Sequence, residues 1–412
     1  MKTLLTAYLF IFSVHFVFAQ NYLVWDKTGI NSTYGESLFT LNQVIHNAKD
    51  NVLKPKLFTE DTPGKKIAGI GYRFSKFIIL DFQLDALTAL IQHEAFGHGF
   101  YYREYGYKDN FYHISLAPPF GKGNGIARKG RLETPRVIGR HENISIEYGG
   151  AESCNVMSNI ILKKWMLAGE MEFDETILFI GTNHNTSGYI LGSDYDDKIK
   201  GDMLDYLTKI NQYHGFTDVD DYPLTLKYLK RRAWIEILNP INLYTSFLYT
   251  WKYIGKGEKS VKMPFIKILG YQYFPNFDLN LNPFGSELVV TNFLRNDRNL
   301  ITGEIRIGDN KLAKSLGGGL GYSQIWSNRP FQFDASLDLW NQDELELGGE
   351  SLKLTEASLG GAARFGANIR LLNGDKPIYF HTQLGYKTSG YLHGQFLREG
   401  LIWRIGLSFN EL

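Results

Sequence analysis

The stretch FQFDASLDLW, residues 331–340, alternates apolar and polar side chains from Phe331 to Leu339. A period of two places the apolar side chains on one face of a β-strand and the polar ones on the other. The same alternation recurs in residues 301–308, 359–371 and 401–409. These segments are about ten residues long, which is the length that a tilted strand needs to cross a bilayer. The pattern therefore predicts membrane-crossing strands.

About eight segments of this kind follow residue 255. They lie near 265–274, 287–296, 298–308, 314–326, 330–341, 357–371, 376–388 and 400–410. Tight turns alternate with longer loops, as they do in outer-membrane barrels, and an even strand number brings both ends of a barrel to the periplasmic side. We therefore predict an antiparallel, about eight-stranded transmembrane β-barrel over residues 259–412.

The polar faces of these strands carry many charged side chains. An eight-stranded barrel is just wide enough for side chains to fill its interior. We therefore expect a packed, ion-paired interior and not a channel lining, made by Glu304, Arg306, Asp334, Asp338, Arg364, Arg370 and Arg404.

Before residue 255 the apolar residues follow a helical period. Helices are expected over 37–51, 80–105, 151–171, 202–214 and 224–253, the last of them interrupted by Pro240. Residues 20–258 are therefore predicted to form a mainly helical N-terminal domain, and the fold class is α+β.

The first residues indicate export. Lys2 precedes an apolar run over residues 4–18, and Ala19 offers a small residue for cleavage. This pattern is typical of a secretory signal peptide, here residues 1–19. Together with the barrel, it predicts a protein of the outer membrane, in contact with its lipid, whose N-terminal domain faces the periplasm. The 44 basic and 43 acidic residues give a net charge of +1, which offers no support for nucleic-acid binding. Cys154 is the only cysteine, so internal disulfides are excluded.

The segment from His93 to Gly99, HEAFGHG, is the candidate site. Two imidazoles and a carboxylate on an otherwise apolar helix are costly to bury unless they are paired or bind a metal. His93 and His98 are five positions apart, roughly 140° around a regular α-helix. The two rings converge only if the helix carries a one-residue π-type bulge, which Gly97 makes easier.

A third ligand must come from another segment. Gly149 and Gly150 allow close approach of a second helix, and Glu152 follows them in its first turn. Glu147 is the competing carboxylate.

The segment from His93 to Gly99 resembles the His-Glu-x-x-x-His motif of dipeptidyl-peptidase III-type zinc peptidases, which belong to the gluzincins. The resemblance implies one zinc ion per chain, bound by His93, His98 and a glutamate on a following helix, with Glu94 as the general base. Glu152 lies 58 residues after Glu94, a spacing similar to that of the family's third ligand. The resemblance covers these two short segments and implies no substrate preference.

A catalytic site of this type also needs a donor for the developing oxyanion. His214, Tyr213 and His184 are the candidates. We therefore predict a zinc-dependent hydrolase and, within that class, a peptidase. Its substrate would be a peptide or another small hydrolysable molecule. The alternatives are a non-catalytic outer-membrane protein whose helical region binds a partner or ligand, and a transport or channel protein.

Overall fold

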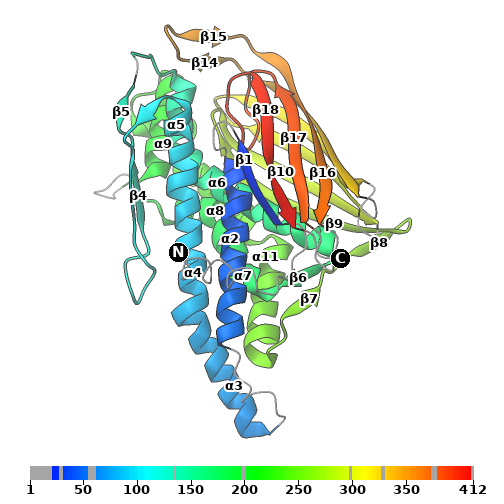
Figure 1. The fold of residues 1–412 in the computed structure, drawn as a ribbon. Coiled ribbons are helices and arrows are strands. Elements are labelled where there is room, and N and C mark those ends of the chain that lie inside the picture. Colours follow the sequence, from blue (N-terminus) through cyan, green and yellow to red (C-terminus); the bar gives the residue numbers. More distant parts are fainter. Residues whose placement is uncertain are drawn as a thin grey trace, which may run out of the picture.

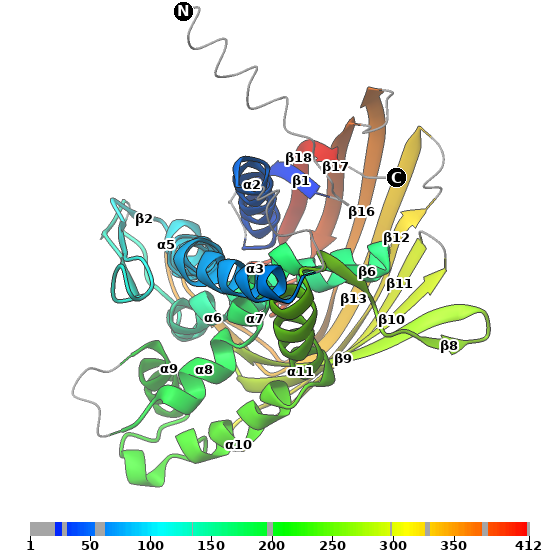
Figure 2. The same ribbon diagram turned by 90° about the horizontal axis from the view of Figure 1, so that it is seen from below.

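The structure, a computed structural model, describes residues 21–26, 31–53, 62–133, 135–195, 201–296, 299–325, 330–372 and 378–409. The predicted signal peptide, residues 1–19, lies outside the described residues. A helical N-terminal part is followed by a large antiparallel sheet that curves around the helices (Figures 1 and 2). The predicted α+β class is confirmed.

The helices form most of the chain before residue 257. They are α2 (Asn31–Val52), α3 (Pro63–Lys76), η2 (Phe77–Asp81), α4 (Phe82–Ile91), η3 (Gln92–His98), α5 (Gly99–Glu104), α6 (Arg140–Ala168), α7 (Phe173–Asn183), α8 (Asn185–Gly192), α9 (Asp202–Tyr213), η4 (Val219–Asp221), α10 (Leu226–Ile237), α11 (Pro240–Leu248) and η5 (Tyr249–Lys256). Within the described residues, no helix is both long enough and apolar enough to span a membrane.

The main sheet has ten strands in the order β1-β18-β17-β16-β13-β12-β11-β10-β9-β8, and each neighbouring pair is antiparallel. The strands are β1 (Asn21–Asp26), β8 (Ile266–Ile268), β9 (Tyr271–Asn282), β10 (Gly285–Asn296), β11 (Asn299–Asp309), β12 (Lys314–Ile325), β13 (Phe331–Gln342), β16 (Ser358–Leu372), β17 (Ile378–Lys387) and β18 (Gly400–Phe409).

The predicted strands from 287 onward are confirmed, but the eight-stranded barrel is wrong in count and in closure. The first predicted segment, 265–274, is divided by a turn at Gly270, where φ is +85°. β1 adds a further strand, with Tyr22 opposite Ser408. Among the described residues, β1 and β8 form the two edges and do not pair with each other.

Side chains of α2 satisfy the backbone of the edge strand β1. The Thr40 hydroxyl accepts from the Tyr22 amide at 3.1 Å and donates to the Tyr22 carbonyl at 3.0 Å. Ser37 makes the same pair of bonds to Val24, at 3.1 and 3.2 Å. Unpaired edge groups favour pairing with another strand, so these hydroxyls end the sheet at β1.

Helices also cover the backbone of β9 near the opposite edge. The Asn155 side chain on α6 donates to the Leu279 carbonyl at 3.1 Å. The Tyr206 hydroxyl on α9 contacts the Asn282 carbonyl at 2.8 Å. Because buried carbonyl groups need partners, these side chains take the place of a strand that would otherwise close a barrel.

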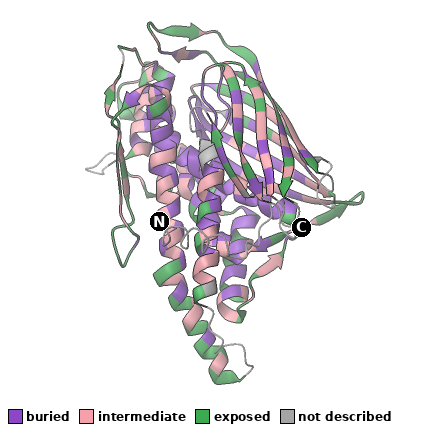
Figure 3. Cartoon of the chain, viewed as in Figure 1, coloured by how far each residue is buried: buried purple, intermediate pink, exposed green. Residues whose placement is uncertain are grey.

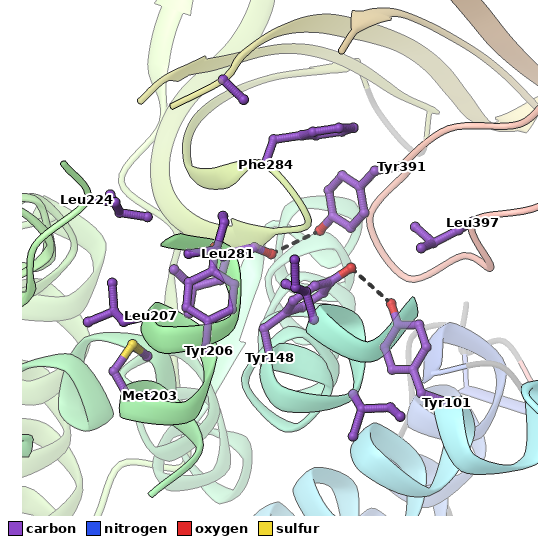
Figure 4. Packing of buried hydrophobic residues seen from close by; sticks show 14 of the residues in the cluster. Tyr101, Tyr148, Met203, Tyr206, Leu207, Leu224, Leu281, Phe284, Tyr391 and Leu397 are labelled. Atoms are coloured by element: carbon purple, nitrogen blue, oxygen red, sulfur yellow. Dashed lines mark hydrogen bonds between the residues drawn. The ribbon is translucent and has the colours of Figure 1, made fainter. Parts of the chain in front are cut away.

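The two predicted regions share their hydrophobic cores. One cluster joins Tyr148 of α6 and Tyr206 of α9 to Leu281 of β9 and Tyr391 of the β17–β18 loop, and Figure 4 shows these side chains facing one another. A second cluster joins Trp165 of α6 to aromatic residues of β9 and β10. The helices therefore pack directly on the sheet.

The charged strand residues lie on the concave face, toward the helices. Arg364 pairs with Asp338 at 2.8 Å, and Arg404 of β18 pairs with Glu36 of α2 at 3.4 Å. A cavity of about 320 Å³ separates part of this face from α6. Exposed and buried residues alternate along the strands in Figure 3. The predicted separation of charged and apolar strand faces is confirmed.

Glu142, which is 0% exposed, ties the start of α6 to the loops of the sheet. Its carboxylate accepts from Arg136 at 2.8 Å and from Arg398 of the β17–β18 loop at 2.9 Å. The amides of Gly139 and Gly348 donate to its second oxygen at 3.0 and 2.9 Å. One buried side chain therefore joins three segments that are distant in sequence.

We predict that Glu142→Ala lowers the free energy of unfolding by about 3–5 kcal/mol, because it leaves two arginines without their buried counter-charge. Chemical unfolding followed by circular dichroism measures this loss. Glu350→Ala is the control, because Glu350 is exposed and its replacement is expected to cost less than about 0.5 kcal/mol. Equal stabilities of the two variants would contradict the role assigned to Glu142.

Candidate metal centre

The helix that carries the histidine motif contains the predicted π-type distortion. α4 continues into η3, a π-helical segment over Gln92–His98, and then into α5. His93 and His98 consequently lie on one side of the helix, with their Nε2 atoms 3.3 Å apart. The bulge predicted from the five-residue spacing is confirmed.

Asp202, the first residue of α9, completes the group. Its Oδ2 atom lies 3.4 Å from Nε2 of His93 and 3.2 Å from Nε2 of His98. The three ligand atoms all lie within 4.8 Å of one another, so this group could hold a metal ion. The Asp202 side chain is 39% exposed, whereas those of His93 and His98 are only 2% and 5% exposed. The group is therefore open to solvent on the Asp202 side.

The hydrogen bonds of the Nδ1 atoms orient both rings. Nδ1 of His98 lies 2.6 Å from the Ile146 carbonyl, which can only accept, so Nδ1 is the donor. Nδ1 of His93 lies 3.1 Å from Oδ1 of Asn185, at the start of α8. In their neutral forms both imidazoles therefore direct an Nε2 lone pair toward Asp202. Three acceptor atoms at this separation repel one another unless a proton or a metal ion lies between them.

The electrostatics of the group agree with a site for a cation. Burial alone lowers the pKa of His98, but the Asp202 and Glu94 carboxylates and the hydrogen bond to the Ile146 carbonyl together raise this pKa to about 9. Burial alone raises the pKa of Asp202, but the two histidines hold it well below its usual range. The group therefore favours a bound positive charge.

Glycines let α6 approach the motif closely. A Cβ atom at Gly150 would lie 2.6 Å from Cδ2 of His93, and one at Gly97 would lie 2.6 Å from the Gly149 carbonyl oxygen. Real Cβ atoms do not approach so closely. The close approach predicted for Gly149 and Gly150 is confirmed.

Glu94 lies beside the group. Its carboxylate packs against Gly125 on β4 (Gly125–Arg128), which pairs with β3 (Phe111–Ile114). Glu94 is 4% exposed, and burial raises the pKa of its carboxyl, against the opposing effect of the two histidines. A carboxylate with a raised pKa is better suited to accept a proton at neutral pH.

Glu152 does not join the histidines in this structure. Its carboxylate accepts from the Tyr101 hydroxyl at 2.6 Å and from the Gly394 amide at 2.9 Å. α6 begins at Arg140, so Glu152 lies in its interior, roughly 200° around the helix from Gly150, which faces His93. Asp202 takes the position that the spacing suggested for Glu152.

The competing carboxylate, Glu147, also lies apart from the group. It forms an ion pair with Lys209, on the helix that carries Asp202.

The three candidate oxyanion donors are not brought into the group. Tyr213 and His214 lie at the end of α9 opposite Asp202, roughly 16 Å away along the helix axis. They line a separate cavity of about 520 Å³ together with His141. His184 follows α7 and precedes Asn185, and it is not a member of the His93, His98 and Asp202 group found among the described residues. Tyr189, which the sequence did not single out, stacks on the His93 ring at 5.0 Å between centroids.

Comparisons of the chain with protein-family models, with curated proteins and with solved structures found no match.

We predict that Gly150→Ala weakens metal binding, because its Cβ atom would displace the His93 ring. Titration with zinc under chelator competition measures this loss. Gly181→Ala is the control, because Gly181 also lies in a helix but has nothing within 4 Å of an added Cβ. That change is expected to stabilise α7 by up to about 1 kcal/mol without altering metal binding. Unchanged zinc affinity in Gly150→Ala would contradict the predicted clash.

Proposed function

We propose that this protein is a zinc-dependent hydrolase of the peptidase class. In this proposal His93, His98 and Asp202 bind the zinc ion. The observation that carries the proposal is the convergence of two Nε2 atoms and one carboxylate oxygen within 4.8 Å. Zinc sites of hydrolases commonly have three such protein ligands and one open position. Hydrogen bonds from the other ring nitrogen, like those of these histidines, are typical of metal ligands.

The residues around the group suit hydrolysis of an amide or a related bond. Zinc, when bound, polarises a substrate carbonyl and makes water a better nucleophile at neutral pH. Glu94 follows His93 directly, interacts with both histidines and with Asp202, and is not itself a ligand in this assignment. It would accept the proton of the attacking water and return it to the leaving group. The exposed Asp202 side gives a substrate access.

We further propose that the sheet attaches the protein to the outer membrane. In β13, β16, β17 and β18, all of whose residues are described, no charged residue is exposed. Their exposed positions instead carry residues such as Leu337, Phe365, Leu384 and Leu401, which are 51–71% exposed. Lipid-facing strands have this composition, and the export signal predicted from residues 1–19 is consistent with it. In that arrangement the helical part faces the periplasm.

We expect purified protein to contain about one zinc ion per chain, and His93→Ala, His98→Ala and Asp202→Asn to lose it. Inductively coupled plasma mass spectrometry measures the content. Asp205→Asn is the matched control, because Asp205 lies in the same first turn of α9 but outside the group. Asp202→Asn that retains zinc with wild-type affinity would contradict the assignment of the third ligand.

Glu94→Gln is expected to keep the zinc and to reduce turnover about 10²–10⁴-fold, because the amide cannot accept a proton. A library of internally quenched peptides supplies the assay. A variant with full zinc content and full turnover would exclude Glu94 as the base. Metal-loaded wild-type protein without hydrolytic activity on any such substrate would favour the non-catalytic binding role.

A further inference from the structure

Large apolar side chains are also exposed on the helical part, next to the β9–β8 edge of the sheet. α11 has the sequence PINLYTSFL, which contains no charged residue. Ile241 and Leu248 face the core, whereas Leu243 and Phe247 are 54% and 63% exposed, and Trp251 of η5 is 54% exposed. An amphipathic helix facing water carries mainly charged and polar residues on its outer face. On α11–η5 the three large apolar side chains share that face with Ser246 and Thr250, and a charged residue is exposed there only at Lys256, the last residue of η5.

The exposed residues of α10, the helix before α11, change from basic to apolar along its length. Lys227 and Arg231 are exposed in its first part. Beyond them, Trp234 and Leu238 are 52% and 61% exposed. Basic residues beside exposed tryptophan and leucine are typical of helices that lie in a membrane interface.

The turn between β8 and β9 carries an exposed leucine, Leu269. Leu269 is 95% exposed and has a φ of +49°, in the left-handed region that a leucine rarely adopts. Ile266 and Ile268 on β8 are 55% and 42% exposed. The side chain of Leu269 therefore gains almost no packing from the protein itself.

These segments continue the outer surface of the sheet. Figure 2 shows α10, α11 and β8 following one another along the side of the molecule where the sheet ends at β9 and β8. Along β10, Leu288, Val290 and Leu294 alternate with buried residues and are partly exposed. Exposed apolar side chains then occur again on the helices and on β8. Soluble monomers rarely expose so many large apolar side chains on neighbouring segments.

We propose that α10, α11–η5 and β8, which we call the helical rim, bind the same lipid bilayer as the sheet. This inference rests on the proposed membrane attachment of the sheet and deepens it. Lysines 256, 259, 262 and 267 are exposed around η5 and β8, within reach of anionic headgroups. Lysine beside tryptophan is the composition of a membrane interface, whereas the core of a dimer interface is depleted in lysine. The metal centre is then held beside the membrane and not on a free domain.

The test labels single cysteines of the full-length protein with the fluorophore NBD. Cys154 is fully buried, so cysteines introduced at the surface are labelled selectively. Phe247→Cys and Leu269→Cys probe the helical rim. Leu384→Cys probes the convex face of the sheet, and Lys122→Cys, in the exposed β3–β4 loop, is the water-facing control. The proteins are reconstituted into liposomes of phosphatidylethanolamine and phosphatidylglycerol, with and without brominated acyl chains.

Brominated chains are expected to reduce NBD emission at positions 247 and 269 as strongly as at 384, and to leave position 122 unchanged. Loss of emission at 384 alone would overturn the helical rim and leave the sheet's attachment intact. No loss at any position would overturn both. Disulfide cross-linking of Phe247→Cys between two copies, without lipid quenching, would show that a second copy covers the rim and would also overturn the proposal. A far-UV circular dichroism spectrum equal to that of the wild type confirms that each variant is folded.

Discussion

The hydrogen-bonding requirement of the sheet's backbone governs the arrangement of the whole molecule. A curved sheet that does not close on itself leaves two strands with unpaired backbone groups. Hydroxyls of Ser37 and Thr40 bond to the edge strand β1, and side chains such as Asn155 and Tyr206 bond to the part of β9 that the short strand β8 leaves unpaired. The helices therefore satisfy the backbone of the sheet at its ends as well as packing on its concave face.

This requirement also places the candidate metal centre. Tyr206, which bonds to the Asn282 and Gly285 carbonyls, lies one helical turn after Asp202 on α9. Asn155, which bonds to the Leu279 carbonyl, lies on the same helix as Gly150, against which His93 packs. The same two helices therefore cap the sheet and bring Asp202 and the supporting glycines to the histidines.

The sequence allowed the strands to be predicted because alternation with a period of two is local information. The edges could not be predicted, because their partners are single side chains on helices far away in sequence. β1 has only six residues and follows the predicted signal peptide, so its pairing with β18 has no counterpart in a local pattern. A count of alternating segments therefore suggested closure by strands, where the protein uses helices.

The same limit applies to the metal group. The spacing of His93 and His98 fixes the need for a bulge, because two rings on one helix are related by its geometry alone. The third ligand depends on how α9 packs. Asp202 lies 104 residues after His98, and an acidic residue at the start of a helix is ordinary, because it complements the helix dipole. No local signal separates Asp202 from other acidic residues in that region.

Several features that lower the stability of helices are concentrated around this group. A π-bulge interrupts the helix at Gln92–His98, and Gly97, Gly149 and Gly150 stand where alanine would favour a helix by roughly 1 kcal/mol each. Each of these features brings the histidines closer to α6 or to each other. Local features that weaken a fold persist where they serve a site. Because a bound cation stabilises only the folded arrangement of His93, His98 and Asp202, its binding energy would offset these costs.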